Sequence, residues 1–591
     1  MTGQPPRPHK GGIMRGWVCV SMFAFLCAAS LAQQATQPET PAQLTPQPGQ
    51  QLFPSVAPDH SIAFSQRNGA DWDVYVLRHA SPPVNLTPDS AADDWQPEFS
   101  ADGKWLAFRS ERNGGGIYLM NPDGRNLKRL TSAGFNPAWS PDGAEIVYST
   151  AQVIADPAFR PIRGTLFAVK VGTGERRIVW ASSDAVQPRW SPNGQRIAFW
   201  GFASQGGQRD LWTITSAGTD PVKVTDDAAT DWNPVWSPDG KYLFFSSDRG
   251  GTMEIWRMPL DQSTGRSQGP PIQITKGGKG VRGHIAFDFA ELGLRLLYIE
   301  QIVNQTVEKV SFDPVAGRVV GQTTSVLDAN LAPSQIDVSP DGNALAFYSA
   351  VQPENLYVAA ADGRGPRQLT NDNFRDRGPA WSPDGKKIAF YSDRSGNYEI
   401  WTINIDGSGL TQVTNTSGVN RSGPLWSPDG SRLAYVQRRG PTWDTYVIDP
   451  TKSPSQQVLQ ELPAIGAGDE YFGPTSWSPD GQKLAGTRTF TDRVAAGGIF
   501  IYSLESRIFQ MIVDKAAGAR WLNDSRRLVY PDSATNKIFL VDTVSPVPVE
   551  IFSIAPRSLG AIRLSPDNKT LYLTLSTSES HVWQLELPPG S

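Results

Sequence analysis

Short apolar runs separated by turn-forming residues recur along most of the chain. In residues 378–415, a Trp-Ser-Pro-Asp-Gly turn is followed by the apolar run 387–391 and by residues 399–405, where polar and apolar positions alternate. Short apolar or alternating runs bounded by Pro, Asp and Gly are typical of β-strands. Further turn signals at 393–397 and 406–409 divide the segment. The pattern therefore predicts four short antiparallel strands in this one segment.

The same turn occurs twelve times, complete or altered. Five complete Trp-Ser-Pro-Asp-Gly copies stand at 139–143, 236–240, 381–385, 426–430 and 477–481. Seven altered copies lie near residues 58, 101, 192, 289, 340, 522 and 566, so that neighbouring copies are 40–51 residues apart. A strand-rich repeat with a period in the forties is typical of β-propeller blades. We therefore expect an all-β fold of twelve four-stranded blades, with the Trp of each turn packed between neighbouring blades.

The core W-S-P-D-G-[KR]-x-[IL]-A-F, complete at 381–390, resembles the TolB-type propeller repeat. It is also similar to the propeller domains of the dipeptidyl peptidase IV and prolyl oligopeptidase families. The resemblance covers nearly all of residues 41–587 and implies a propeller, but one fold hosts many functions. The hydrolase domain of those peptidases and the N-terminal α/β domain of TolB have no expected counterpart, because the repeats fill the chain.

Residues 1–32 have the composition of a signal peptide. Basic residues precede the apolar stretch 17–31, and Ser30-Leu31-Ala32 places small residues where cleavage before Gln33 is expected. An uncleaved anchor, or lipidation at Cys27, is an alternative. Both cysteines lie in this segment, so the mature chain has neither a disulfide nor a thiolate metal site. It carries 51 Lys and Arg against 58 acidic residues, a net charge of −7, and no basic run for nucleic acid.

The repeats divide most simply into two six-bladed propellers in tandem. Residues 33–40 form a flexible leader, 41–314 the first propeller and 315–591 the second. Each half would begin with an outer strand, at 42–45 or 318–327, and end with a blade of three strands. The third strands of those last blades are expected at 306–312 and 581–587. A seven-plus-five division and one undivided ring are the alternatives.

The loop that leads into each inner strand is the best candidate for a binding site. In a propeller this loop runs from the rim to the central axis, so its side chains gather at one mouth of the tunnel. Aromatic, acidic and Arg side chains there can grip a peptide, a sugar or a partner loop. The candidates are Asp94, Trp95, Asp231, Trp232, His284, Phe374, Arg375, Arg377, Arg421, Tyr471 and Phe472. The competing interpretation is that the aspartates cap turns and the aromatics pack between blades.

No standard catalytic or cofactor motif stands out. The four mature histidines, His60, His79, His284 and His581, lie far apart in the sequence, so we expect neither a metal nor a cofactor. A G-x-G-x-x-G match at 278–283 precedes a strand-like segment and not the helix that a dinucleotide site needs.

Two functions fit the sequence. The first is a non-catalytic periplasmic or secreted scaffold, resembling the TolB propeller, that binds envelope or secreted proteins or peptides. The alternative is a lyase- or hydrolase-like enzyme or a sugar-binding protein with its site at a tunnel mouth. Neither requires nucleic acid or a membrane span after signal cleavage. Convergence of His284 with two carboxylates would favour the enzyme, whereas aromatic and Arg-rich mouths would favour partner binding.

Overall fold

The computed structural model describes residues 41–588 apart from short stretches at 46, 48, 70, 80, 152–163, 203–208, 228, 279, 291–292, 352–353, 417–418, 421–422, 440–441, 467–469, 491–495 and 556. The signal segment 1–32 and the leader 33–40 therefore lie outside the described residues. The regular structure is β-strand, with single turns of 3₁₀ helix at Arg112–Gly114, Ala329–Leu331 and Pro454–Gln456 among the described residues. This confirms the all-β fold class.

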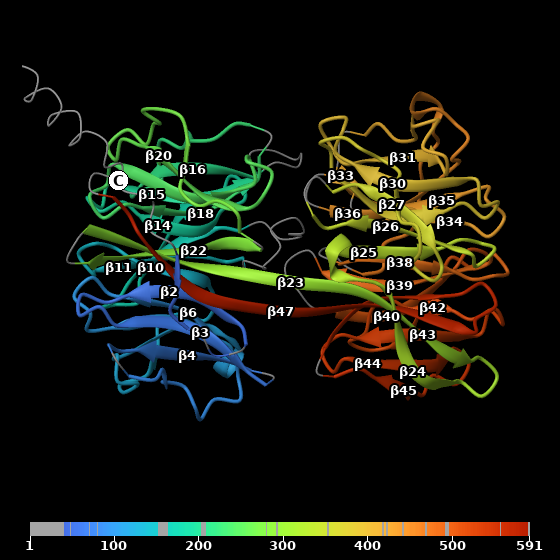
Figure 1. The fold of residues 1–591 in the computed structure, drawn as a ribbon, viewed down its shortest axis with the longest axis horizontal. Coiled ribbons are helices and arrows are strands. Elements are labelled where there is room, and N and C mark those ends of the chain that lie inside the picture. Colours follow the sequence, from blue (N-terminus) through green and yellow to red (C-terminus); the bar gives the residue numbers. More distant parts are fainter. Residues whose placement is uncertain are drawn as a thin grey trace, which may run out of the picture.

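Two groups of antiparallel sheets make up the molecule (Figure 1). Strands of the first group are β1 (Ala42–Gln43), β2 (Gln51–Val56), β3 (Ile62–Asn68), β4 (Asp71–Leu77), β5 (Val84–Asn85), β6 (Asp94–Phe99), β7 (Leu106–Ser110), β8 (Gly116–Met120), β9 (Lys128–Arg129), β10 (Phe135–Trp139), β11 (Glu145–Ser149), β12 (Leu166–Lys170), β13 (Arg176–Trp180), β14 (Val186–Trp190), β15 (Arg196–Phe202), β16 (Arg209–Thr215), β17 (Val222–Lys223), β18 (Asp231–Trp236), β19 (Tyr242–Ser247), β20 (Glu254–Pro259), β21 (Ile272–Gln273) and β22 (Val281–Ala290).

Strands of the second group are β24 (Arg318–Leu327), β25 (Pro333–Val338), β26 (Ala344–Ser349), β27 (Leu356–Ala360), β28 (Arg367–Gln368), β29 (Asp376–Trp381), β30 (Lys387–Ser392), β31 (Glu399–Asn404), β32 (Thr411–Gln412), β33 (Val419–Asn420), β34 (Leu425–Trp426), β35 (Leu433–Arg439), β36 (Thr442–Ile448), β37 (Gln460–Glu461), β38 (Glu470–Trp477), β39 (Lys483–Phe490), β40 (Ala496–Ser503), β41 (Phe509–Val513), β42 (Arg520–Trp521), β43 (Arg527–Asp532), β44 (Lys537–Asp542), β45 (Val549–Ser553) and β46 (Ser558–Leu564). Two long strands, β23 (Gly293–Asp313) and β47 (Thr570–Glu586), belong to both groups.

Where it follows an inner strand, the Ser-Pro-Asp-Gly segment makes a tight turn, as its residues predict. In the copy after β29, Ser382 Oγ donates to Asp384 Oδ1 at 2.6 Å and accepts from the Lys387 N–H at 2.9 Å. Gly385 has a φ of 70°, which favours glycine. The same Ser-to-Asp bond recurs after β6, β10, β18, β25, β34, β38 and β46. The turn is thus closed by its own side chains.

The inner strands of each group contact one another in a closed cycle. In the first ring the cycle runs β2, β6, β10, β14, β18, β22 and back to β2. In the second ring it runs β25, β29, β34, β38, β42, β46 and back to β25. Apolar side chains fill the space between neighbouring sheets, and one such cluster joins Trp200 of the β15 sheet to Trp232 and Trp236 of the β18 sheet. Packing between sheets therefore closes each ring.

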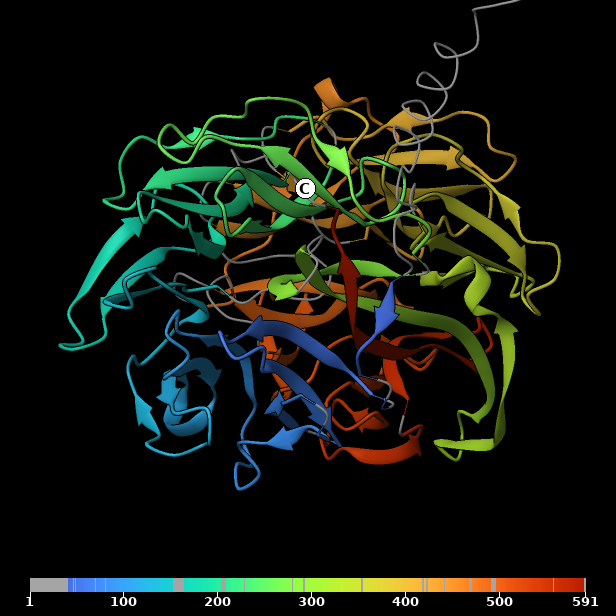
Figure 2. The same cartoon turned by 60° about the vertical axis from the view of Figure 1, so that its left-hand side comes forward.

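The two rings share their last sheets through β23 and β47. These two strands pair antiparallel along their length, from Arg295 opposite Glu586 to Ser311 opposite Thr570. In the first ring the sheet order is β22, β23, β47, β1, and in the second ring it is β46, β47, β23, β24. Each long strand is therefore the second strand of one sheet and the third strand of the other (Figures 1 and 2).

This sharing corrects the expected assignment of two third strands. The segment 306–312, expected to complete the first half, pairs with β24 and the first half of β47 in the second ring. The segment 581–587, expected to complete the second half, lies in the first ring, where β1 pairs with it. Both segments have the mixed polar and apolar composition of a half-buried strand, so only long-range pairing decides which sheet each one joins.

Candidate functional site

The leading ends of the inner strands in the two rings face each other. In the shared sheets, β22 begins opposite the middle of β23 at Gln301 and ends opposite Gly293, the start of β23. Correspondingly, β46 begins opposite Ser576, near the middle of β47. Because β23 and β47 continue from these middle points into the other ring, both mouths expected to carry the site lie between the rings.

Arg375 connects the two mouths. It precedes β29 in the second ring, and its Nη2 donates to Thr230 Oγ1 at 2.6 Å and to Asp248 Oδ2 at 3.0 Å, both in the first ring. It also pairs with Asp393 of its own ring at 3.5 Å. The side chain is mostly buried by these contacts. Arg375 therefore contributes to the packing of one ring against the other.

The candidate aspartates are buried in ion pairs within their own sheets. Asp94 accepts from Arg112 Nη2 at 2.6 Å, and both Asp231 oxygens accept from Arg249 Nη2 at 2.9 and 2.8 Å. Burial raises the pKa of Asp94 to about 6 and also raises the pKa of Asp231. Each carboxylate anchors the start of an inner strand to an arginine that follows the second strand of the same sheet. These ion pairs differ from the turn-capping role that competed with a binding role in the sequence analysis.

The candidate aromatics of the first ring also pack in its interior. Trp95 is buried edge-on against Phe53, with 5.9 Å between ring centroids. Trp232 is buried and donates its indole N–H to Met253 Sδ at 3.2 Å. His284 lies between these groups, 4.1 Å from the Phe53 centroid and 5.6 Å from that of Trp232. The structure therefore gives both tryptophans a packing role.

His284 lacks the surroundings that a catalytic or metal-binding role needs. Burial lowers its pKa to about 3, so the imidazole is neutral at physiological pH. Its ring packs against aromatic groups, and its Nδ1 has no hydrogen-bond partner in the described structure. The convergence of two carboxylates on His284, which would have favoured the enzyme alternative, is not seen among the described residues. Within the described part of the chain, no group of three His, Cys, Asp or Glu side chains could hold a metal ion.

The second-ring candidates fall into three classes. Tyr471 packs 5.9 Å from Trp443, Phe472 lies in an apolar cluster, and Arg377 forms a buried ion pair with Glu354. Phe374 alone of these is exposed, at 41%, with Arg394 over its ring. Arg421 lies outside the described residues. The structure thus brings Asp248, Arg375 and Asp393 together at the junction and places most of the remaining candidates in the interior.

Two short sequence motifs, typical of a dinucleotide-binding site and of a hydrolase nucleophile, do not form such sites in the structure. Gly278 and Gly280 precede β22, which is a strand, so the G-x-G-x-x-G match opens no helix. Residues 265–269 match G-x-S-x-G, the pattern of a hydrolase nucleophile. There Ser267 Oγ donates to the Gly269 carbonyl at 2.7 Å in an exposed loop between β20 and β21, without a strand-to-helix turn.

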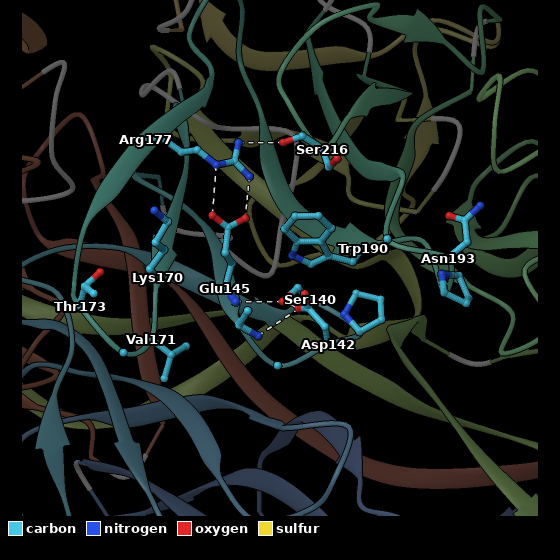
Figure 3. A pocket seen from close by; sticks show the side chains of 16 residues that line it. Ser140, Asp142, Glu145, Lys170, Val171, Thr173, Arg177, Trp190, Asn193 and Ser216 are labelled. Atoms are coloured by element: carbon cyan, nitrogen blue, oxygen red, sulfur yellow. Dashed lines mark hydrogen bonds and ion pairs between the residues drawn. The ribbon is translucent and has the colours of Figure 1, made fainter.

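A groove on the outward face of the first ring is a feature that the sequence did not indicate. It has a volume of about 840 Å³ and lies between the Ser-Pro-Asp-Gly turn after β10 and the Ser-Pro-Asn-Gly turn after β14 (Figure 3). Arg177 spans one wall, donating to Glu145 Oε2 at 2.7 Å and to the Ser216 carbonyl at 2.7 Å. Trp190 lies between these groups and Asn193 (Figure 3), and its buried indole N–H has no hydrogen-bond partner within the described structure. Lys170 and Thr173 are exposed at the rim.

A family model described as the TolB beta propeller domain matches residues 135–288 and 288–463, which together make up more than half of the chain. The chain belongs to this TolB beta-propeller family. Curated relatives include a Protein TolB homolog of Chlorobium chlorochromatii, 30% identical over 25% of this chain, and a Tol-Pal system protein TolB of Anaeromyxobacter dehalogenans, 32% identical over 22%. An uncharacterised protein of Agrobacterium fabrum is 27% identical over 31% of the chain. The matches span 32%, 28% and 58% of those relatives, in the same order.

Solved structures show the same likeness at low similarity. TolB from Acinetobacter baumannii is 18% identical, with a TM-score of 0.25, and the match covers 64% of this chain and 82% of that one. Oligogalacturonate lyase from Vibrio parahaemolyticus is 15% identical, with a TM-score of 0.33, and the match covers 63% and 95%. No helix of the described residues is long and apolar enough to span a membrane.

Proposed function

We propose that this protein is a non-catalytic scaffold of the periplasm or the extracellular space that binds other envelope or secreted proteins. The two rings are its two six-bladed propellers, in tandem and joined by β23 and β47. Support comes from the TolB family match and from the predicted signal peptide. The curated relatives match only part of this chain and only part of their own length. We therefore do not transfer their partners to this chain and describe the partner only by the chemistry of the surface that would bind it.

The observation that carries this proposal is the commitment of the mouth residues to internal contacts. Asp94 and Asp231 are held by arginines of their own sheets, and His284 is enclosed by aromatic rings. Acid–base catalysis needs a titratable group within reach of a substrate, which these buried positions do not offer. The engagement of these groups in internal contacts therefore favours a non-catalytic role.

The groove of Figure 3 is the surface that we assign to a partner. It faces away from the second ring, because Ser-Pro-Asp-Gly turns follow the ends of inner strands whose beginnings face that ring. A half-buried Trp beside a polar rim is typical of protein contact sites. The exposed side chains of Lys170 and Thr173 at the rim suit the polar backbone and side-chain groups of a protein loop, so the occupant we propose is a loop of a partner protein.

The test is capture of proteins from envelope extract by the immobilised mature chain. The double variant Lys170→Glu and Thr173→Arg blocks the rim of the groove, and Lys386→Glu makes a matched charge reversal on an exposed turn of the second ring. We expect one or more partners to be lost with the groove variant and retained with the control. Retention of every partner by the groove variant would contradict this site, and no capture by the wild-type chain would contradict the scaffold. Cleavage of pectin fragments by the pure chain would support the enzyme alternative.

A further inference from the structure

In each repeat, the residue two positions before the turn serine, or before the residue that replaces this serine, lies on the inner strand. Its side chain faces the axis of the ring. In the first ring this position holds Glu98 on β6 and Arg189 on β14, which pair at 3.3 Å although β10 stands between their strands in the cycle. Only side chains directed toward the axis can meet past an intervening strand. The residues at this position therefore determine which charges lie on the axis of each ring.

In the second ring the same position carries an unequal set of charges. Asp337 on β25, Arg520 on β42 and Arg563 on β46 occupy it, and their strands follow one another in the cycle, with β25 next to β46. The other three residues at this position are Ala380, Leu425 and Ser476, which are neutral. The first ring is thus balanced, with one acid and one base, whereas the second has two guanidinium groups and one carboxylate.

The contacts of these three side chains show that one guanidinium lacks a carboxylate among the described residues. Arg563 Nε donates to Asp337 Oδ1 at 3.3 Å, and Asp337 Oδ2 accepts from the Trp381 N–H at 2.8 Å. Both carboxylate oxygens are therefore engaged. Arg520 Nε and Arg563 Nη1 donate to the same acceptor, the Ile562 carbonyl, at 3.3 and 2.9 Å. Two cations that share one carbonyl oxygen repel each other, and an anion between them removes that repulsion.

Solvent reaches the charged side chains of the second ring. The side chains of Arg563 and Asp337 stay 20% and 25% exposed, although they project from the middle of the ring. The bulge of the inner strand is glycine at Gly378 and Gly560 in the second ring, whereas on β25 it holds Gln335. In the first ring, buried side chains occupy the bulge and fill the axis: Phe53, Gln96, Asn136, Gln187, Asn233 and His284.

We propose that the axis of the second ring binds an oxyanion, carboxylate or phosphate, between Arg520 and Arg563. The planar guanidinium fork matches the paired oxygens of either group. Asp337 positions Arg563, and Arg520 supplies the charge that no carboxylate in the described part of the ring neutralises. Burial and the adjacent Arg563 also lower the pKa of Arg520 well below its usual value, which is the expected sign of a guanidinium short of negative charge.

The test is calorimetric titration of the mature chain with inorganic phosphate and, separately, with acetate at constant ionic strength. We expect saturable binding of at least one of them, at least tenfold weaker in Arg520→Gln and unchanged in Arg364→Gln, whose side chain is 87% exposed in the same ring. Binding of phosphate alone or of acetate alone supports the site and identifies the source of the oxyanion.

Two further results complete the test. Arg520→Gln should fold, because it removes a repelling cation and leaves no carboxylate of the described structure unpaired. Arg520→Lys keeps the charge but loses the fork, so we expect binding of intermediate strength. Saturable binding of neither anion to the wild-type chain would overturn the proposal, as would equal binding by the wild-type chain and Arg520→Gln.

Discussion

Truncation after Thr577 should open the first ring, although the deleted residues are at the opposite end of the sequence. In the structure, residues 578–586 of β47 are the third strand of the first ring's last sheet and the partner of β1. The second ring keeps all four strands of its shared sheet, because β46 pairs only with residues 571–576. If the third strands were not exchanged, the end of the chain would belong to the second ring, and the same truncation would disorder that ring instead.

The expected loss is large compared with the stability of a domain. The truncation removes three buried apolar side chains, Val582, Leu585 and Leu587, which pack against residues of the first ring. Full burial of each contributes about 1.5–3 kcal/mol, so the three contribute about 5–9 kcal/mol. Single domains are stable by only about 5–15 kcal/mol, so the first ring should lose much or all of its order.

Hydrogen–deuterium exchange followed by mass spectrometry separates the two outcomes. We expect fast exchange in peptides from 42–66 and 281–302 and retained protection in peptides from 520–577. Leu585→Ala and Leu573→Ala form a matched pair in the same strand, since they lie in cores of the first and second rings respectively. Each should cost about 2–5 kcal/mol in its own ring. Loss of protection confined to the second ring after truncation would refute the strand exchange.

Three further predictions concern single side chains. Arg375→Ala removes the ion pair to Asp248 across the junction, so the distribution of distances between spin labels on the two rings should broaden. An unchanged distribution would show that the pair does not hold the rings together. His284 is buried with its pKa lowered to about 3 from 6.5, so the folded state resists protonation and stability should fall by about 1.4 kcal/mol per pH unit as pH drops below 6.5. In His284→Gln, the melting temperature should depend less on pH below 6.5, and an unaltered dependence would exclude His284 as its cause. Trp236→Ala should cost about 3–5 kcal/mol in urea unfolding because its indole fills the gap between two sheets, whereas a cost below about 1 kcal/mol would show that the gap collapses.

Local chemistry made the repeat predictable, whereas long-range pairing did not. The turn at 381–385 is closed by Ser382 and Asp384, which both belong to it, so its local sequence alone indicates its conformation. The segments 306–312 and 581–587 both mix polar and apolar residues as half-buried strands do, and nothing in either sequence assigns it to one sheet. Their exchange depends on pairing between the middle of the chain and its end, a choice that a single strand's sequence does not carry.

The loop before each inner strand could be recognised from the sequence, whereas the contacts of its side chains could not. The slot before each inner strand does hold acidic and aromatic residues, yet Asp94 and Asp231 each pair with an arginine that follows the second strand of the same sheet. The recurring Asp-Arg pair at 248–249 and 393–394 hinted at this, because an arginine at a constant place is a feature of the repeat. Arg520 and Arg563 gave no such signal, since each belongs to an eroded copy and they meet only when β42 and β46 pack side by side.

The exchange of β23 and β47 also governs when the molecule can fold. Neither shared sheet can form before the chain has been supplied to residue 570, and the first ring needs the strand that ends at Glu586. Such pairing demands closure of a very long loop, which is slow. Before that step, ten of the eleven sheets formed by the described residues can assemble, but the six-stranded sheet that contains β23 and β47 cannot, so both rings have an open edge. Completion of the two rings is therefore one late event, and a chain delivered in full before folding starts, as in export, would avoid a long-lived open intermediate.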